Sequence, residues 1–119
     1  PLALTGQNLF TQLGCSTCHL SNSQGRGPNL VGIFGKKVLL EDGRTLVADE
    51  NYVRESIVSP GSKIVSGFKP IMPTFQGIIS DDQLNALVAY VKSLSQQQPG
   101  EGAGSVAAAS PQPKTRQVQ

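Results

Sequence analysis

Residues 15–19 read Cys-Ser-Thr-Cys-His and are the most informative stretch of this 119-residue chain. Positions three and four apart on a helical turn lie on one face, so Cys15, Cys18 and His19 can reach one planar group together. A Cys-x-x-Cys-His sequence is an attachment site for c-type haem, in which two sulfurs bind the vinyl groups and the imidazole binds the iron. His19 is the only histidine and is therefore the expected proximal iron ligand.

Two other uses of a Cys-x-x-Cys pair were weighed against haem. A thioredoxin-like dithiol expects a βαβ context, and the chain shows no pattern of parallel strands. A structural zinc site needs about four ligands, whereas the chain has two cysteines and one histidine. We therefore favour one covalent haem c, and a non-haem dithiol or metal-binding module is the alternative of another class.

The sixth iron ligand is a choice among Met72, water and a lysine. Met72 is the only methionine, and Pro70 and Pro73 bracket it in a loop that can hold its sulfur against a flat cofactor. A lone methionine is more often core filler, but this context favours ligation. A His19 and Met72 pair leaves no open iron position, which suits electron transfer and predicts no catalytic residue.

The composition predicts one small domain followed by a tail. Residues 96–119 are rich in Gln, Pro, Gly, Ala and Ser without a hydrophobic period, so we expect a flexible low-complexity tail. Residues 1–95 remain to fold, and so small a core commonly depends on a large cofactor. The net charge of +2 argues against nucleic acid as a partner. No stretch is long and apolar enough to span a bilayer, so we expect a soluble, monomeric domain.

Hydrophobic periodicity predicts three helices. The first covers residues 5–14 and runs into the cysteines, and the second covers residues 50–58 after Asp49 as its cap. The last helix begins at a capping box formed by Ser80 and Gln83, and its apolar stripe continues to residue 94. Residues 21–35 contain too many glycines for a regular element and are expected to form an ordered loop.

A β-hairpin is expected within residues 36–47. Apolar residues stand on both sides of Asp42-Gly43, a dipeptide that suits a two-residue hairpin turn.

These features, taken together, resemble the class I cytochrome c family from about residue 5 to residue 95. The matching residues are Gly6 and Phe10, the Cys-x-x-Cys-His motif, the Gly-Pro-Asn-Leu segment at 27–30 and Tyr90. The resemblance implies a mainly α class I cytochrome c fold, with three to five short helices around one haem and the hairpin as an insertion. It also implies that Gly6 and Phe10 pack against Tyr90, and that the Pro28 carbonyl accepts a hydrogen bond from the His19 ring.

The groups that bind the haem propionates are harder to assign. The tryptophan that usually serves in the family is absent, because the chain contains no Trp. Arg44, Tyr52 or Asn51 could take its place.

A narrower resemblance concerns residues 41–94. This stretch is similar to the C-terminal cytochrome c domain of subunit II of caa-type haem-copper oxidases, including the hairpin and the Met-Pro-x-Phe segment at 72–75. The resemblance implies electron entry from an upstream carrier and transfer to the dinuclear copper centre of subunit II. It also implies a domain tethered to a membrane complex, on the periplasmic or extracytoplasmic face of the bacterial cytoplasmic membrane. The chain begins with Pro rather than Met, which fits a fragment of that kind.

The alternative is a free periplasmic or lipid-anchored monohaem carrier. In either case the partners are redox proteins, which dock through short-lived interfaces. We consider two kinds of docking surface. One consists of lysine side chains that steer an acidic partner, and the other is an apolar patch formed by residues such as Ile71 and Phe75. The lysines in question are Lys36, Lys37, Lys63 and Lys69.

Overall fold

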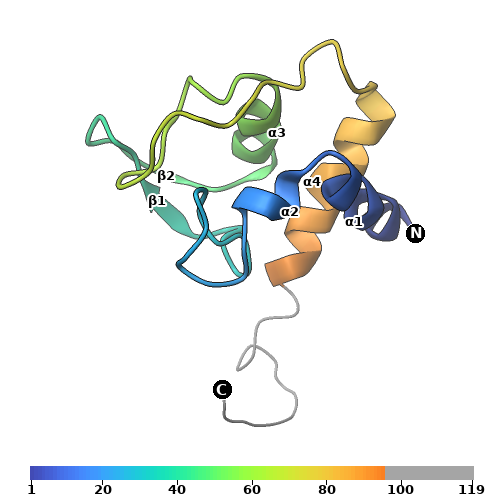
Figure 1. The fold of residues 1–119 in the computed structure, drawn as a ribbon. Helices are drawn as coiled ribbons and strands as arrows, with labels where there is room; N and C mark the ends of the chain where they lie inside the picture. The colour runs from blue at the N-terminus through green and yellow to red at the C-terminus, as the bar shows by residue number, and fades with distance from the viewer. Residues whose placement is uncertain (96–119) are drawn as a thin grey trace, which may run out of the picture.

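The computed structural model describes residues 1–95, and within them the chain forms four helices and one two-stranded antiparallel sheet (Figure 1). The elements are α1 (Leu2–Gln12), α2 (Cys15–Cys18), β1 (Lys37–Leu39), β2 (Thr45–Val47), α3 (Glu50–Val58) and α4 (Asp81–Ser95). The predicted class, mainly helical with a small hairpin, is confirmed. The tail expected at 96–119 lies outside the described residues.

Helices α1 and α4 cross at close range, as Figure 1 shows. Gly6 makes this possible, because a Cβ at that position would overlap the backbone carbonyl of Ala86 and the Cβ of Tyr90. One turn later the rings of Phe10 and Tyr90 lie 5.2 Å apart between centroids, tilted by 59°. The expected packing of Gly6 and Phe10 against Tyr90 is confirmed.

The main core lies where α4 meets α1 and α3. Phe10, Val53 and Ile57 are buried there together with the apolar stripe of α4, which consists of Leu84, Leu87, Val88 and Val91. A second, smaller core lies under the hairpin and is formed by Val38, Leu40 and Ala48. The stripe predicted on the last helix is the side of α4 that the protein buries, and only its final residue, Leu94, stays partly exposed.

Helix α3 has the predicted bounds because its signals are local. The Asp49 side chain accepts a hydrogen bond from the Tyr52 amide at 2.9 Å, and the helix ends at Val58, two residues before Pro60. The capping box of α4 is also present: the Ser80 hydroxyl accepts from the Gln83 amide at 3.1 Å, and the Gln83 side chain accepts from the Ser80 amide at 2.8 Å.

Helix α1 differs from its prediction at both ends. It begins at Leu2 and ends at Gln12, rather than covering residues 5–14. Gly14 explains the end, because its φ of 82° is left-handed and separates α1 from α2.

The hairpin is present, but its predicted two-residue turn is wrong. The Leu40 amide donates to the Arg44 carbonyl at 2.8 Å, so three residues, Glu41 to Gly43, form the loop. Gly43 has a φ of 93°, as expected of the glycine that closes a three-residue hairpin loop. Asp42 adds a local reason, because its side chain accepts from the Arg44 amide at 3.0 Å.

The long connection between α3 and α4, residues 59–80, is called the Met72 loop below. It is fastened to the hairpin by two backbone hydrogen bonds, from the Glu41 amide to the Ile64 carbonyl at 2.7 Å and from the Ser66 amide to the Leu39 carbonyl at 2.9 Å. In Figure 1 this loop passes in yellow above α2 and the blue segment that follows it. The two segments form opposite sides of the site described next.

Candidate cofactor site

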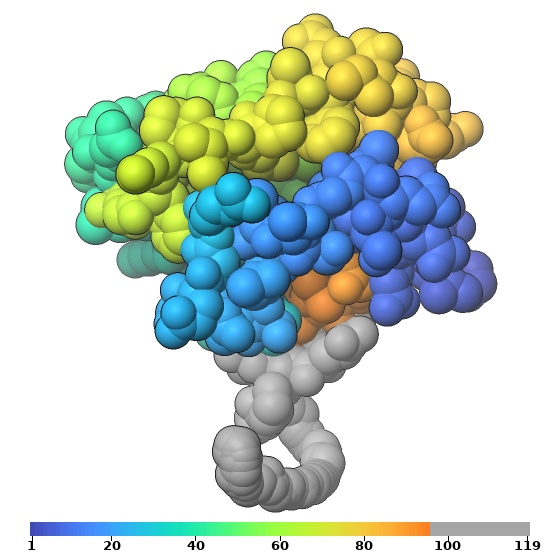
Figure 2. All heavy atoms as spheres, viewed as in Figure 1, coloured from blue at the N-terminus to red at the C-terminus, as the bar shows by residue number. Residues whose placement is uncertain are grey.

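A large apolar cavity lies between α2 and the Met72 loop. It encloses about 1310 Å³, counted out to its open mouth and including the solvent-filled space there. In Figure 2 it opens between yellow atoms of the Met72 loop and blue atoms around α2, with green atoms lying deeper. Most of its walls are apolar, with Phe10, Leu30, Ile33, Phe68, Phe75 and Leu87 among the lining residues.

Both cysteines of the motif line this cavity. They lie at the two ends of α2, are partly buried, and are free thiols rather than a disulfide. Burial raises the pKa of the Cys15 thiol above its usual value, and the neighbouring Cys18 adds to the rise, against a backbone hydrogen bond that lowers it. The Cys15 sulfur is therefore a neutral thiol at neutral pH.

The His19 ring is held in one orientation. Its Nδ1 lies 2.8 Å from the Pro28 carbonyl oxygen, and because a carbonyl can only accept, Nδ1 carries the proton and donates it. The other ring nitrogen, Nε2, then keeps a free lone pair that can bind a metal. The hydrogen bond expected between His19 and Pro28 is thus present in the structure.

Gly27 lies against the face of the same ring. A Cβ at this position would lie 2.7 Å from His19 Cε1 and 2.9 Å from Nδ1, closer than side chains approach. The Gly27 amide also donates to the Cys18 carbonyl at 3.0 Å, which ties the Gly-Pro segment to the end of α2. The absence of a side chain at Gly27 is therefore part of how the imidazole is seated.

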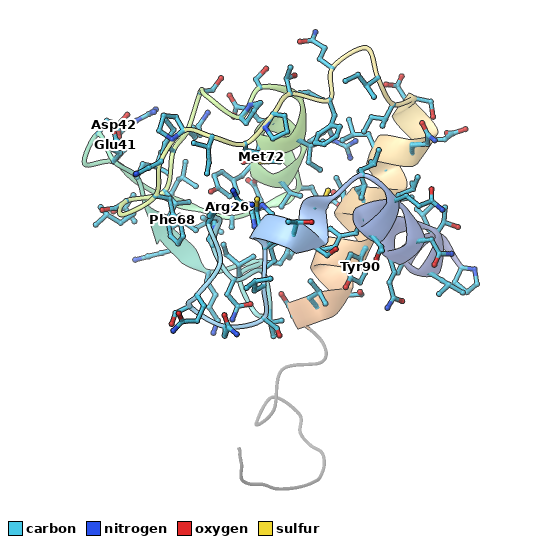
Figure 3. All side chains as sticks on the ribbon, viewed as in Figure 1. Arg26, Glu41, Asp42, Phe68, Met72 and Tyr90 are labelled. Carbon is cyan, nitrogen blue, oxygen red and sulfur yellow. The ribbon has the colours of Figure 1, made fainter. Side chains whose placement is uncertain are left out.

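Met72 reaches the cavity from the opposite segment. It is partly buried, packs against the main core and lines the cavity (Figure 3). Lys63 and Lys69 line it as well, so two lysines join Met72 there as candidates for a sixth ligand.

The structure does not bring Arg44 to the cavity, and its expected role with the propionates is dropped. Arg44 does not line the cavity and is 57% exposed at the hairpin loop, where its Nε donates to Asp42 at 2.8 Å. Figure 3 shows Asp42 at the far end of the hairpin from Met72. Asn51 is also exposed and does not line the cavity.

Tyr52 does line the cavity, unlike the other two residues considered for this role. Burial raises the pKa of its phenol, and a hydrogen bond with Ser56 offsets part of that rise. Its phenol remains a neutral donor at neutral pH.

Several lining residues were not predicted as site residues from the sequence, and three of them carry a charge or an aromatic ring that faces the site. Arg26, next to Gly27 in the turn after α2, and Phe68, in the Met72 loop, both line the cavity and are labelled in Figure 3. Lys63 also lines the cavity and was considered only as a docking lysine. For Arg26 the adjoining Gly-Pro segment was an available signal, whereas the positions of Lys63 and Phe68 depend on the path of an irregular loop.

The residues present fit a c-type haem. Two thiols, a free imidazole nitrogen and a thioether line one apolar cavity, and Gly27 leaves room for the ring that would bind iron. Fold and site therefore define a small helical domain built around a covalently attached haem. A family model of cytochrome c matches residues 3–95. The chain belongs to the cytochrome c family, whose function is haem-based electron transfer and whose cofactor is haem c.

Proposed function

We propose that the chain would hold one haem c through Cys15 and Cys18, and that His19 and Met72 would bind its iron. The observation that carries the proposal is that these four side chains line a single cavity, while the Pro28 carbonyl leaves His19 Nε2 free to bind. When bound, the haem supplies a one-electron couple. Under this proposal no residue among 1–95 is catalytic.

The protein's own groups adjust how that couple behaves. Donation from His19 Nδ1 to Pro28 raises the basicity of Nε2 and fixes the plane of the ring. The apolar walls exclude water and strengthen electrostatic interactions inside the cavity. A thioether as sixth ligand favours reduced iron and leaves no position for oxygen. Tyr52 is retained as a hydrogen-bond donor to a propionate because it lines the cavity.

We further propose that this domain is the electron-entry domain of a caa-type cytochrome c oxidase. Support comes from the resemblance over residues 41–94, which includes the hairpin and the segment after Met72. The domain would accept electrons from an upstream carrier and pass them to the dinuclear copper centre of subunit II. Covalent haem attachment takes place outside the cytoplasm, so the proposed location is the extracytoplasmic face of the membrane. Within residues 1–95 no helix is both long and apolar enough to cross a bilayer.

The gene that encodes the chain tests the oxidase assignment. We expect membrane helices and a dinuclear copper domain to be encoded upstream of residue 1. A signal sequence directly before residue 1 would contradict the assignment and support a free carrier.

A kinetic test addresses the same assignment with protein. Mixing the reduced domain with an oxidised dinuclear copper domain should bleach the reduced haem spectrum at a rate that saturates with copper-domain concentration. No transfer to that partner, with fast transfer to a soluble terminal reductase, would favour the free carrier.

A further inference from the structure

We infer that the ion pair between Glu55 and Lys63 sets the reduction potential of the site. Lys63 is the positive charge that faces the cofactor, and Glu55 positions its ammonium group and offsets its charge. The inference deepens the proposed function and rests on it.

This pair differs from the other ion pairs of residues 1–95. Lys63 Nζ lies 2.5 Å from Glu55 Oε1, and the two side chains are 25% and 36% exposed. In the pairs of Asp42 with Arg44 and of Glu50 with Lys92, every side chain is more than half exposed. Water screens exposed pairs strongly, so only the Glu55 and Lys63 charges keep much of their effect at a distance.

Lys63 belongs to the wall of the cavity, and Glu55 stands behind it. Lys63 lines the cavity and Glu55 does not. The backbone next to Lys63 is fixed on one side by the Ser62 amide, which donates to Ser59 at 3.0 Å, and on the other by Ile64, whose carbonyl accepts from Glu41. The ammonium group is therefore held in place from α3, unlike that of a mobile surface lysine.

The charges that line the cavity all have one sign. Arg26, Lys63 and Lys69 contribute positive charges, and no Asp or Glu among residues 1–95 lines it. Arg26 and Lys69 are exposed, and Lys63 is the only one of the three that is partly buried. A haem carries two propionate carboxylates, and a partly buried cation at the wall is the chemistry that balances such a group.

The consequence for the reduction potential has a definite sign. Oxidation adds one positive charge at the iron, so a nearby cation disfavours the oxidised state and raises the potential, whereas a nearby anion lowers it. Lys63 and Glu55 therefore act in opposite directions. If the pair served only to fasten the Met72 loop to α3, breaking it from either side would admit water to the same cavity. Both substitutions would then shift the reduction potential in the same direction.

The test is a redox titration of the haem-loaded protein, in which the absorption spectrum reports the fraction of reduced haem. We expect Lys63→Met to lower the potential, Glu55→Gln to raise it, and the double variant to fall between the two. Asp42→Asn and Arg44→Met are matched controls, because they break an exposed pair that does not line the cavity, and neither should shift the potential. The shifts at Glu55 and Lys63 should persist at high salt.

Shifts of the same sign in Lys63→Met and Glu55→Gln, or no shift in either, would overturn the inference and leave the proposed function intact. Loss of the methionine-ligand absorption band in Lys63→Met would also overturn it, because Lys63 would then act on iron ligation. If Lys63→Met does not fold, the isosteric Glu55→Gln decides alone, since an unchanged or lowered potential contradicts the inference. A wild-type chain that carries no haem c would refute the proposed function itself.

Discussion

At the scale of single residues, the orientation of His19 is the feature on which the site depends. Its ring donates a hydrogen bond from Nδ1 to the Pro28 carbonyl and lies against Gly27. The centroids of the Phe10 and His19 rings are 6.3 Å apart. Each of these neighbours limits a different movement of the imidazole. A rigid ring keeps Nε2 aimed at one point, which is what a permanent iron ligand requires.

Replacing Gly27 with Ala should disturb this arrangement. The new Cβ would stand 2.7 Å from the imidazole, so either the ring or the Gly-Pro backbone must move. We expect the free energy of unfolding of the haem-loaded protein to fall by about 1–3 kcal/mol, measured by denaturant titration. Ser16→Ala, at an exposed position of the motif, is the control and should stay within about 0.5 kcal/mol of wild type. Equal stability of all three proteins would show that the ring is not confined as described.

Tyr52 provides a prediction about pH. Burial raises the pKa of its phenol above the usual value of about 10, so the unfolded state loses this proton before the folded state does. The stabilisation by neutral Tyr52 is then complete below about pH 10 and is lost as pH rises further. The free energy of unfolding of wild type minus that of Tyr52→Phe should therefore decrease between about pH 9 and about pH 11. A difference that does not change with pH would mean that Tyr52 titrates normally.

Residues tied to a local motif could be predicted, whereas residues placed by a loop could not, except for Met72, which Pro70 and Pro73 bracket. Cys15, Cys18 and His19 share one short segment, so their common direction follows from sequence spacing. Arg44, one of three residues considered for the propionates, does not line the cavity, because its side chain is held by Asp42, two residues away, at an exposed loop. Hydrophobic periodicity in the sequence does not predict such a side-chain contact within a loop. The contribution of Lys63 was missed because it depends on the path of the Met72 loop.

At the scale of elements, the crossing of α1 and α4 fixes where the motif stands. Helix α1 leads directly into α2, so any change in the crossing moves both cysteines. Gly6→Ala would press a methyl group into the backbone of Ala86, which cannot rotate away. We expect the free energy of unfolding to fall by about 2–3 kcal/mol. Gln7→Ala, exposed on the same helix, should leave it nearly unchanged, and a similar small effect at Gly6 would contradict the close crossing.

The elements also show what sequence patterns can predict. Helices α3 and α4 have clear capping residues, so the start of each was predictable within a residue. Helix α1 lacks a side-chain cap at its start, and its first turn begins earlier than the pattern indicated. The hairpin could be located but its turn could not, because loop length depends on which residues pair across the strands.

At the scale of the whole molecule, the charges are separated although the total is small. The chain has ten Lys and Arg and eight Asp and Glu, of which Lys114, Arg116 and Glu101 lie beyond the described residues. The remaining acids include pairs at the hairpin loop and at the first residues of α3 and α4. Among residues 1–95, the charged side chains that line the cavity are all cations. An acidic partner would be attracted to the side on which the cavity opens.

Lys69→Gln tests this attraction without altering the ion pair at Lys63. Lys69 is exposed and lines the cavity. With an acidic redox partner at low salt, the bimolecular rate constant should fall by up to about fivefold, and its salt dependence should weaken. Lys92→Gln is the control, because Lys92 lies over the Phe34 ring and does not line the cavity. A wild-type rate that does not vary with ionic strength would instead support docking through apolar residues such as Ile71, which is 50% exposed.

Whether the protein carries a haem c bound by His19 and Met72 can be read from the absorption spectrum of the purified protein, oxidised and then reduced. We predict the narrow α band of a low-spin c-type haem in the reduced form, at one haem per chain. The oxidised form should show the weak methionine-to-iron charge-transfer band, and Met72→Ala should abolish it, since Met72 is the only methionine. A coloured wild-type protein without that band would show that Met72 is not the iron ligand. A colourless protein would contradict the account as a whole.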